Sequence, residues 1–448
     1  MKINNYYKQY LIKLLKIPQS SNKIRTLFSP TDFNKELIYS ISKARFRIYI
    51  VLLYFDCDRS GRLILDTLYK AKKNYYNLDI VIIVDLNRAK RNRFGNTNKV
   101  TNIDWYYYIA QINSDIEIPI YGIPISNREY LGVFHLKGFI IDNKVIYSGA
   151  NINDIYLEKL NYCRYDRYKI IKNRLLADTL VYYIKQYLLT AKAINRLNNI
   201  NSKNIIVNNN IFTLRKTLRT ANYHYLGTIN YNKLSIIPLV GLGKYNLLNK
   251  TIYHLIYSAQ KKIILCTPYF NIPNVLFNSI VDVLNLGITV EIIVSDKTAS
   301  DFYVPKKNDN FHITNIIPYL YEINLRNIMV KLQNYIDHGD LIIKIWKNQY
   351  NSFHMKGIWI DNDWCMLTSN NFNMRSWQLD LENALLIYDP QHFLTKENEI
   401  ELNNINNYTK LIKHYNDIQI IADYPIKIRN LINKIQKINF DKIIKFLI

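Results

Sequence analysis

The sequence predicts an α/β fold of two tandem α/β/α units, related by a pseudo-twofold axis and sharing one active site. A pattern of His, Lys two residues later and Asp seven residues later occurs twice, from His135 to Asp142 and from His354 to Asp361. The segments before the two copies also match in order and spacing. The length of 448 residues is enough for two hydrophobic cores and unusually long for one.

The first unit begins with a helix, a short basic turn and a buried strand. This order is predicted for Leu37–Phe55, LIYSISKARFRIYIVLLYF, where helical spacing of apolar residues gives way to a continuous apolar run. A second buried strand is predicted at Asp79–Asp85. Continuous apolar strands between helices indicate a sheet covered on both faces. The first motif lies on another strand, and His135 follows Phe55 by 80 residues.

The second unit repeats this order. Leu255–Phe270, LIYSAQKKIILCTPYF, predicts the end of a helix, a basic turn and an apolar strand, and Val290–Asp296 predicts the next strand. His354 follows Phe270 by 84 residues, close to the spacing in the first unit. Chance alternation of helix and strand would not reproduce both order and spacing, so we interpret the second unit as a copy of the first.

A polar, asparagine-rich stretch at residues 201–210 is the expected start of the connection between the units. We place the N-terminal unit at 1–205 and the C-terminal unit at 206–448, which ends in a basic amphipathic tail from about residue 424. Apolar residues in this tail recur at spacings of three and four, as on one face of a helix. Such a stripe either packs on the protein's own core or lies on an anionic membrane, and the sequence leaves both interpretations open.

The formal net charge of +24 indicates a polyanionic partner, either a nucleic acid or an anionic membrane surface. The abundance of Lys, Asn, Ile and Tyr also indicates a compositional bias that explains part of this charge. No run of about 18 apolar residues predicts a spanning helix, and the N-terminus lacks the features of a signal peptide. The four cysteines have no metal-ligand spacing, so we expect reduced thiols in the cytoplasm and no bound metal.

The repeated motif predicts chemistry on a phosphodiester. In an extended strand, residues two apart project from the same face, so each histidine lies beside its lysine. An imidazole can attack phosphorus or transfer a proton, while an ammonium balances the charge on the phosphoryl oxygens. A single copy would equally fit a buried core histidine and an exposed strand lysine. The duplicated context favours two such faces that meet at one site.

The sequence around the motifs resembles the bacterial type I phosphatidylserine synthases of the phospholipase D superfamily. The resemblance extends from about Phe28 to the C-terminus and is carried by blocks such as FHLKGFIIDNKVIYSGANINDIYL, VDLNRAKRNRFG, SDKTASDFY and WQLDLENALLIYDP. It implies a cytoplasmic enzyme, peripherally associated with the inner face of the cell membrane, that needs no cofactor. The implied reaction transfers the phosphatidyl group from CDP-diacylglycerol to L-serine, giving phosphatidylserine and CMP through a phosphatidyl-histidine.

Other functions stay open at this point. A phosphatidylglycerophosphate or cardiolipin synthase would use the same chemistry with another acceptor, since serine comes from the resemblance alone. A phospholipase D-type nuclease or a nucleic-acid-binding protein would fit the charge. The lipid-synthase blocks and the apolar face of the tail argue against a nucleic-acid partner, so none is expected.

The resemblance implies that His135 is the nucleophile and His354 the acid/base. Lys137 and Lys356 would then hold the phosphoryl oxygens as charge develops.

A catalytic histidine also needs a carboxylate on its other ring nitrogen. Asp166 and Glu382 follow the two histidines by 31 and 28 residues. In related enzymes such a carboxylate serves the histidine of the opposite half. The alternative for each is a surface ion pair.

Four further residues belong to the motifs or to the turns after them. Asp142 and Asp361 follow their strands with parity opposite to the lysines, and the superfamily resemblance implies a structural role in fixing the loop. Asn151 and Asn371 are candidates for binding the substrate phosphate, with helix N-capping as the alternative. Asn151 follows Asp142 by nine residues and Asn371 follows Asp361 by ten, which leaves the equivalence of the two asparagines open.

Overall fold

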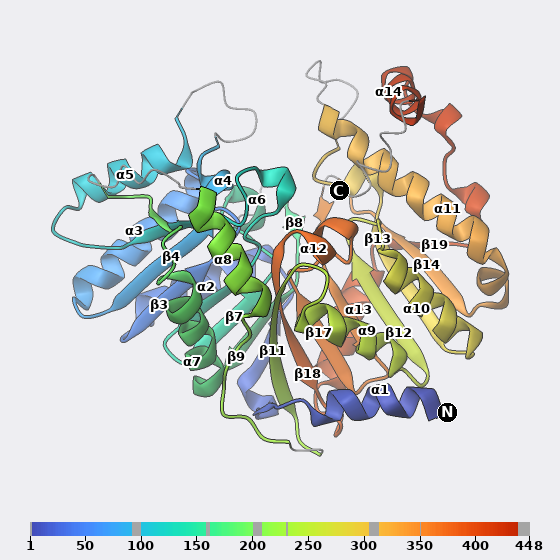
Figure 1. Ribbon diagram of the computed structural model, residues 1–448, viewed down its shortest axis with the longest axis horizontal. Helices are drawn as coiled ribbons and strands as arrows, with labels where there is room; N and C mark the ends of the chain where they lie inside the picture. The colour runs from blue at the N-terminus through green and yellow to red at the C-terminus, as the bar shows by residue number, and fades with distance from the viewer. Residues whose placement is uncertain are drawn as a thin grey trace.

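Two sheets with matching strand order form the centres of the two units, which lie side by side in the computed structural model (Figure 1). The structure describes residues 2–91, 100–157, 162–199, 208–229, 232–303, 313–349 and 351–437. The first sheet has the order β10-β5-β4-β3-β6-β7-β9-β2. Its strands are β2 (Ile24–Leu27), β3 (Arg47–Val51), β4 (Asp79–Asp85), β5 (Ile120–Ile123), β6 (Gly138–Ile141), β7 (Lys144–Ser148), β9 (Tyr168–Lys172) and β10 (Asn195–Arg196).

The second sheet has the order β1-β11-β18-β17-β16-β12-β13-β14-β19. The strands are β1 (Ile17–Pro18), β11 (Ser235–Leu242), β12 (Lys262–Thr267), β13 (Thr289–Ser295), β14 (Leu341–Trp346), β16 (Gly357–Ile360), β17 (Trp364–Thr368), β18 (Leu381–Tyr388) and β19 (Thr409–Ile412). In both sheets three parallel strands are followed by antiparallel ones, and β3 and β12 each pair with the strand that follows a motif lysine. The two-unit α/β fold predicted from the sequence is confirmed.

Helices pack on both faces of the two sheets. Those of the first unit are α2 (Pro30–Lys43), α3 (Arg59–Asn74), α4 (Leu86–Ala89), α5 (Asn102–Ile112), α6 (Asp154–Leu157) and α7 (Arg174–Tyr183). Those that follow are α8 (Asn208–Thr220), α9 (Leu247–Tyr257), α10 (Asn274–Asn285), α11 (Ile317–His338), α12 (Met374–Gln378), α13 (Thr395–Asn406) and α14 (Ile426–Lys437).

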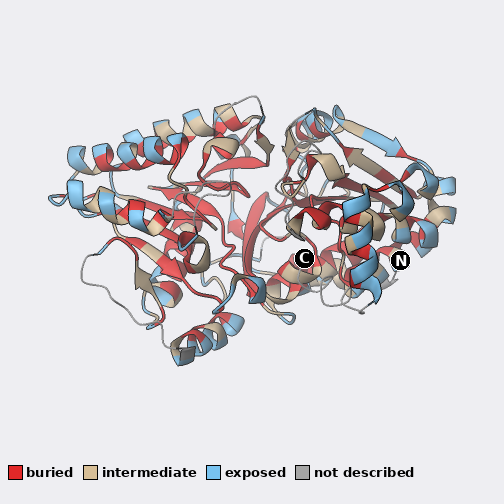
Figure 2. Ribbon diagram, turned by 90° about the horizontal axis from the view of Figure 1, so that it is seen from above, coloured by how far each residue is buried: buried red, intermediate tan, exposed pale blue. Residues whose placement is uncertain are grey.

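Strand β3 shows why its sequence is apolar throughout. Ile48 and Ile50 face the core under α2 and α3, whereas Tyr49 and Val51 face a second core shared with residues of the other sheet. Successive strand residues point to opposite faces, so a strand covered on both sides needs apolar residues at every position. Figure 2 shows the buried residues concentrated on the sheets and the exposed ones on the outer surfaces of the helices.

The N-terminal residues of the chain pack on the second unit. Helix α1 (Lys2–Lys13) packs against α9, and β1 pairs with β11 at Ile17↔Ile236 (Figure 1). These elements fall inside the range predicted for the first unit, 1–205. The predicted boundary itself lies in residues 200–207, outside the described residues, so the division of the chain stays a prediction.

The apolar stripe of the C-terminal tail packs on the protein. Ile428, Ile432 and Ile435 of α14 are buried in one cluster with Ile316 and Tyr319. This part of the stripe is a core element and is not available to a membrane, which corrects the membrane interpretation for these residues. The rest of the predicted tail, residues 438–448, lies outside the described residues.

Candidate active site

Each motif histidine lies on a short segment that crosses to the opposite unit. The amide of His135 donates to the carbonyl oxygen of Leu381 at 3.0 Å, and the amide of His354 donates to that of Tyr165 at 2.9 Å. Before His354 the pairing extends to two short parallel strands, β8 (Arg164–Tyr165) and β15 (Ser352–Phe353). The residues directly after these partners are Glu382 and Asp166. The crossing therefore places each predicted carboxylate beside the histidine of the other unit.

The two histidine–carboxylate pairs are short and buried. Nδ1 of His135 lies 2.9 Å from Oε2 of Glu382, and Nδ1 of His354 lies 2.7 Å from Oδ2 of Asp166. All four side chains are almost fully shielded from solvent. A carboxylate on Nδ1 holds a proton there and leaves Nε2 as the reactive nitrogen.

The two pairs differ in electrostatics. Burial raises the pKa of Glu382 to about 8. Burial acts in the same direction on Asp166, but the ammonium of Lys356 and the hydrogen bond from His354 outweigh it and lower the pKa of that carboxyl. Burial and then Lys356 lower the pKa of His354 to about 4, and burial and Lys137 lower that of His135. The carboxylate beside His354 is therefore the better partner for an imidazole that gains a proton.

Both motif lysines are buried at the same site. The Nζ of Lys137 donates to Oδ1 of Asn151, and the Nζ of Lys356 donates to the carbonyl oxygen of His354 at 2.6 Å. Burial lowers the pKa of Lys137, and the charge of Lys356 lowers it further. Two cations in one dry site favour an anionic ligand between them.

The residues after the two carboxylates also play matching roles. Asn383 accepts from the amide of Lys137 at 3.0 Å and donates to its carbonyl oxygen at 2.9 Å. Arg167 donates to the carbonyl oxygen of Lys356 at 3.3 Å and forms a buried two-pronged ion pair with Glu401. These contacts fix the backbone of each lysine from the opposite unit. Neither residue was singled out in the sequence, although both stand next to a predicted carboxylate.

The turn after each motif contacts the carboxylate of its own unit. A Cβ added to Gly149 would lie 2.6 Å from Oδ2 of Asp166 and 2.9 Å from Nζ of Lys356. At the matching position of the second unit, the hydroxyl of Ser369 donates to Glu382. Ser369, which stands where the first unit has Gly149, is therefore part of the support for Glu382.

We expect Gly149→Ala to lower activity by at least about tenfold, because the new methyl group would displace Asp166 or Lys356 from the imidazole of His354. The initial rate of the variant, compared with that of the wild-type protein, would test this. An alanine variant with wild-type rate would contradict the packing described for this turn.

Asp142 and Asp361 fix turns away from the histidines. Asp142 accepts hydrogen bonds from the amides of residues 45, 46 and 47, and Asp361 from those of residues 260, 261 and 262. Both have a positive φ, 52° and 54°. They stand at the far ends of β6 and β16 from the motif lysines. This geometry supports the structural role that the resemblance implies and places both aspartates outside the reacting groups.

The two asparagines occupy matching positions with different contacts. Ile141 pairs with Lys144 across a two-residue turn, whereas Ile360 pairs with Trp364 across three residues. The extra turn residue explains the unequal spacing in the sequence. Oδ1 of Asn151 accepts from the amide of Leu53 at 3.1 Å as well as from Lys137, while among the described residues the buried Oδ1 of Asn371 has no hydrogen-bond partner.

A polar network beside His354 was not predicted. The hydroxyl of Tyr156 lies 3.1 Å from Nδ1 of His354 and 3.3 Å from Nη1 of Arg164. Nε of Arg164 lies 3.0 Å from Oδ1 of Asp301, whose other oxygen accepts from the hydroxyl of Tyr269 at 2.8 Å. Two features of the sequence could have indicated this network. Asp301 lies within the SDKTASDFY block, and Arg164 stands two residues before Asp166.

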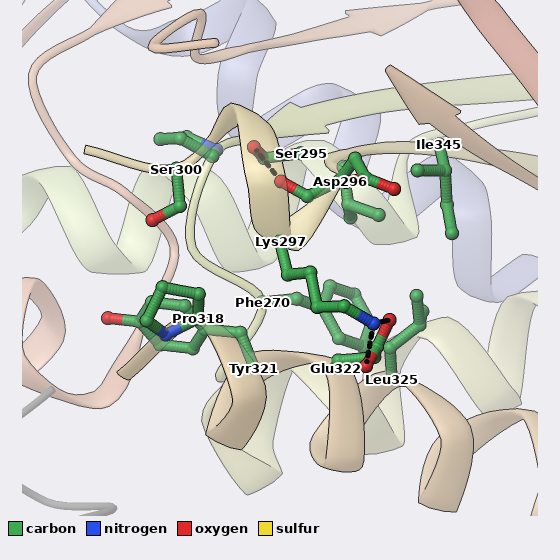
Figure 3. A pocket seen from close by; sticks show the side chains of 12 residues that line it. Phe270, Ser295, Asp296, Lys297, Ser300, Pro318, Tyr321, Glu322, Leu325 and Ile345 are labelled. Carbon is green, nitrogen blue, oxygen red and sulfur yellow. Dashed lines mark hydrogen bonds and ion pairs between the residues drawn. The ribbon is translucent and has the colours of Figure 1, made fainter. Parts of the chain in front are cut away.

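Two cavities lie near these elements. One of about 20 Å³, room for one water molecule, lies at the carboxyl ends of β13 and β14, where Lys297 contacts Glu322 at 2.8 Å (Figure 3). The other, of about 220 Å³, lies between the units and reaches Asp166 and Arg167; its further lining residues are Leu27, Phe28, Tyr165, Met355, Glu401, Asn404, Ile405, Asn407 and Tyr408.

The described residues contain no group of three or more His, Cys, Asp or Glu side chains suited to hold a metal ion. None of the described cysteines forms a disulfide, and three of the four are buried. None of the helices in the described part of the chain is long and apolar enough to cross a bilayer.

The fold and the reciprocal histidine site define a phospholipase D-like protein, and residues 37–213 and 252–403 match the family described as "Cardiolipin synthase, PLD-like domain". The chain is 46% identical over 441 residues to the CDP-diacylglycerol–serine O-phosphatidyltransferase PssA of Escherichia coli, covering 98% of each. It is 40% identical to the corresponding protein of Haemophilus influenzae, covering 96% of this chain and 95% of that one. The crystal structure of the H. influenzae phosphatidylserine synthase matches with a TM-score of 0.95, 38% identity and 99% coverage of both chains. The chain belongs to the bacterial type I phosphatidylserine synthase family.

Proposed function

We propose that the protein transfers the phosphatidyl group from CDP-diacylglycerol to L-serine, giving phosphatidylserine and CMP. The observation that carries this proposal is the reciprocal pair of buried histidine–carboxylate contacts, in a chain 46% identical to a CDP-diacylglycerol–serine O-phosphatidyltransferase. Two histidines allow one to hold the phosphatidyl group while the other moves the proton.

In the first step, Nε2 of His135 attacks the phosphorus on the diacylglycerol side and the bond from that phosphorus to the CMP oxygen breaks. His354 donates a proton to the departing CMP. In the second step, His354 takes the proton of the serine hydroxyl, whose oxygen attacks the same phosphorus. The bond to His135 breaks and phosphatidylserine leaves, so each histidine returns to its starting state.

The electrostatics of the two pairs support this assignment. His354 lies beside the carboxylate with the lowered pKa, which stabilises an imidazolium. Its own lowered pKa of about 4 leaves His354 unprotonated at neutral pH, so that it can accept the proton of the serine hydroxyl in the second step. A bound anionic substrate offsets the charge of Lys356 and thereby raises the pKa of His354 for the first step. A phosphatidyl-histidine at position 135 carries positive charge, which in turn favours the ionised form of Glu382.

The lysines and one asparagine supply the phosphate contacts in this proposal. Lys137 and Lys356 bind the phosphoryl oxygens, where their positive charges stabilise the negative charge of the transition state. Asn151 is already engaged by Lys137 and the backbone, so it positions that lysine. The side chain of Asn371 is the one proposed to contact the phosphate directly.

An acceptor panel tests the function. The purified protein is incubated in detergent micelles with CDP-diacylglycerol and labelled L-serine, glycerol 3-phosphate or phosphatidylglycerol in turn. Label from serine should enter lipid with release of CMP, and EDTA should leave the rate unchanged because the two lysines already supply positive charge. Incorporation of glycerol 3-phosphate or phosphatidylglycerol in place of serine would assign another phosphatidyltransferase activity.

The proposal includes peripheral association with an anionic membrane at the inner face of the cell membrane. The formal net charge of +24 and a lipid substrate support it. Because the apolar stripe of α14 is buried, the contribution of this helix would come from exposed basic side chains such as Lys427 and Lys434. Binding to vesicles should rise with the anionic lipid content and fall with salt.

A further inference from the structure

The two histidine environments differ in charge at one position of the chain. Two residues before the orienting carboxylate, the first unit has Arg164 and the second has Asp380. Asp380 accepts from the amide of Val133 at 2.9 Å and from Nε of Arg375 at 3.0 Å, on the His135 side. The position therefore carries a cation beside His354 and an anion beside His135.

Arg164 forms an ion pair that faces the site. Its Nε lies 3.0 Å from Oδ1 of Asp301, and each of the two side chains keeps 13% of its surface exposed. The hydroxyl of Tyr156 links the pair to the motif, because it lies 3.3 Å from Nη1 of Arg164 and 3.1 Å from Nδ1 of His354. Within the described residues the hydrogen bonds of the guanidinium run through Nε and Nη1, which leaves the Nη2 donors for a ligand.

Aromatic rings hold the pair in place. The guanidinium of Arg164 lies 4.9 Å from the ring centroid of Tyr156, whose ring is 5.5 Å from that of His354. The hydroxyl of Tyr269 donates to Asp301, and its ring lies 6.1 Å from the imidazole of His354. A cation and an anion fixed 3.0 Å apart beside a proton-transferring imidazole complement a small zwitterion with a hydroxyl group.

We propose that Arg164 and Asp301 select the acceptor: Arg164 binds the serine carboxylate, Asp301 binds the serine ammonium, and the hydroxyl is thereby directed to His354. This inference rests on the proposed function.

The test compares acceptors that each lack one charge of serine. Ethanolamine has no carboxylate, and 3-hydroxypropionate has no ammonium group. Kinetics of labelled acceptor incorporation in CDP-diacylglycerol micelles give kcat/KM for all three. Arg164→Gln should reduce the preference for serine over ethanolamine by on the order of 30-fold or more, because only serine loses a partner. Asp301→Asn should reduce the preference for serine over 3-hydroxypropionate in the same way.

The controls separate selection from general damage. Exchange of labelled CMP into CDP-diacylglycerol needs only the first half-reaction, so its rate in each variant measures damage to that step separately from acceptor choice. Arg375→Gln removes the comparable arginine on the His135 side, and it should leave both acceptor preferences unchanged whatever its effect on rate. Arg164→Lys keeps the charge without the planar fork and should give an intermediate preference.

The outcomes are distinguishable. If the wild-type protein does not incorporate serine, the proposed function fails. If it does, and both variants keep the wild-type preferences, the assignment of Arg164 and Asp301 is wrong. If Arg164→Gln does not fold, the Arg164→Lys and Asp301→Asn preferences decide, and unchanged ratios in both would overturn the proposal.

Discussion

Alanine at His135 or at His354 is expected to abolish serine incorporation, with a loss on the order of 10⁴-fold or more. Neither attack on phosphorus nor proton transfer has a substitute in the site, because the nearby carboxylates contact the Nδ1 atoms of the rings. The measurement is the initial rate with labelled serine in micelles. His338→Ala, an exposed histidine at the end of α11, serves as the matched control and should keep the wild-type rate.

The two histidine variants should differ in one respect. With labelled CDP-diacylglycerol and no acceptor, only a protein that retains the nucleophile can carry covalent lipid. Label on His354→Ala and none on His135→Ala would agree with the roles proposed above. The opposite pattern would exchange the two roles, and wild-type turnover by both variants would rule out the phosphatidyl-histidine route.

Replacement of the two carboxylates should separate stability from activity. Glu382→Gln and Asp166→Asn should each lower the rate by about 10³- to 10⁴-fold, because an amide does not hold the neighbouring imidazole in the required tautomer and orientation. Their effects on thermal stability should have opposite signs. At pH 8, Glu382→Gln should raise Tm and Asp166→Asn should lower it.

The signs follow from the two pKa shifts. Folding raises the pKa of Glu382 to about 8, so below that pH the folded pair of Glu382 and His135 holds a proton that an unfolded glutamate, with its ordinary pKa of 4.5, has released. Wild-type stability therefore falls as the pH rises through this window, and the glutamine variant lacks that loss. The pKa of Asp166 is lowered by folding, so its carboxylate stabilises the protein above the ordinary aspartate pKa of 3.8 and the contribution is lost in acid.

Scanning calorimetry between pH 5 and pH 8 would check this prediction. The Tm difference between Glu382→Gln and the wild-type protein should grow with pH. Parallel curves for the two proteins would show that Glu382 does not bind the extra proton.

The sequence allowed prediction of the parts of the fold and site that repeat. The apolar strands of both units and the two motifs are visible because each occurs twice in the same order. Asp166 and Glu382 could be chosen because a histidine requires a carboxylate and their spacings are similar. The crossing of each motif to the other unit came from the family resemblance, since no local pattern specifies which segments far apart in the chain will pair.

What could not be predicted depends on tertiary contacts. Asp301 reaches Arg164 from a loop 137 positions further along the chain, with no spacing rule to connect them. The stripe of α14 has the same period whether it packs on protein or on lipid, and only the contacts of Ile428 and Ile432 distinguish the two cases. Likewise, the turn between β16 and β17 is one residue longer than the turn between β6 and β7, so counting from the aspartates could not align Asn371 with Asn151.

The reciprocal pairing of histidines and carboxylates has a consequence for how such a protein can specialise. Two identical subunits with the same crossing would present two identical imidazoles, and every substitution that suited the lipid donor would also alter the side that receives the alcohol. Joining both halves in one polypeptide removes that constraint. Arg164 can then differ in charge from Asp380, and Asp166 can differ from Glu382, while each half still depends on the other to complete its histidine. Each separated half of this chain would lack the carboxylate that orients its own histidine, and only reassociation of the two halves would restore a complete reaction centre.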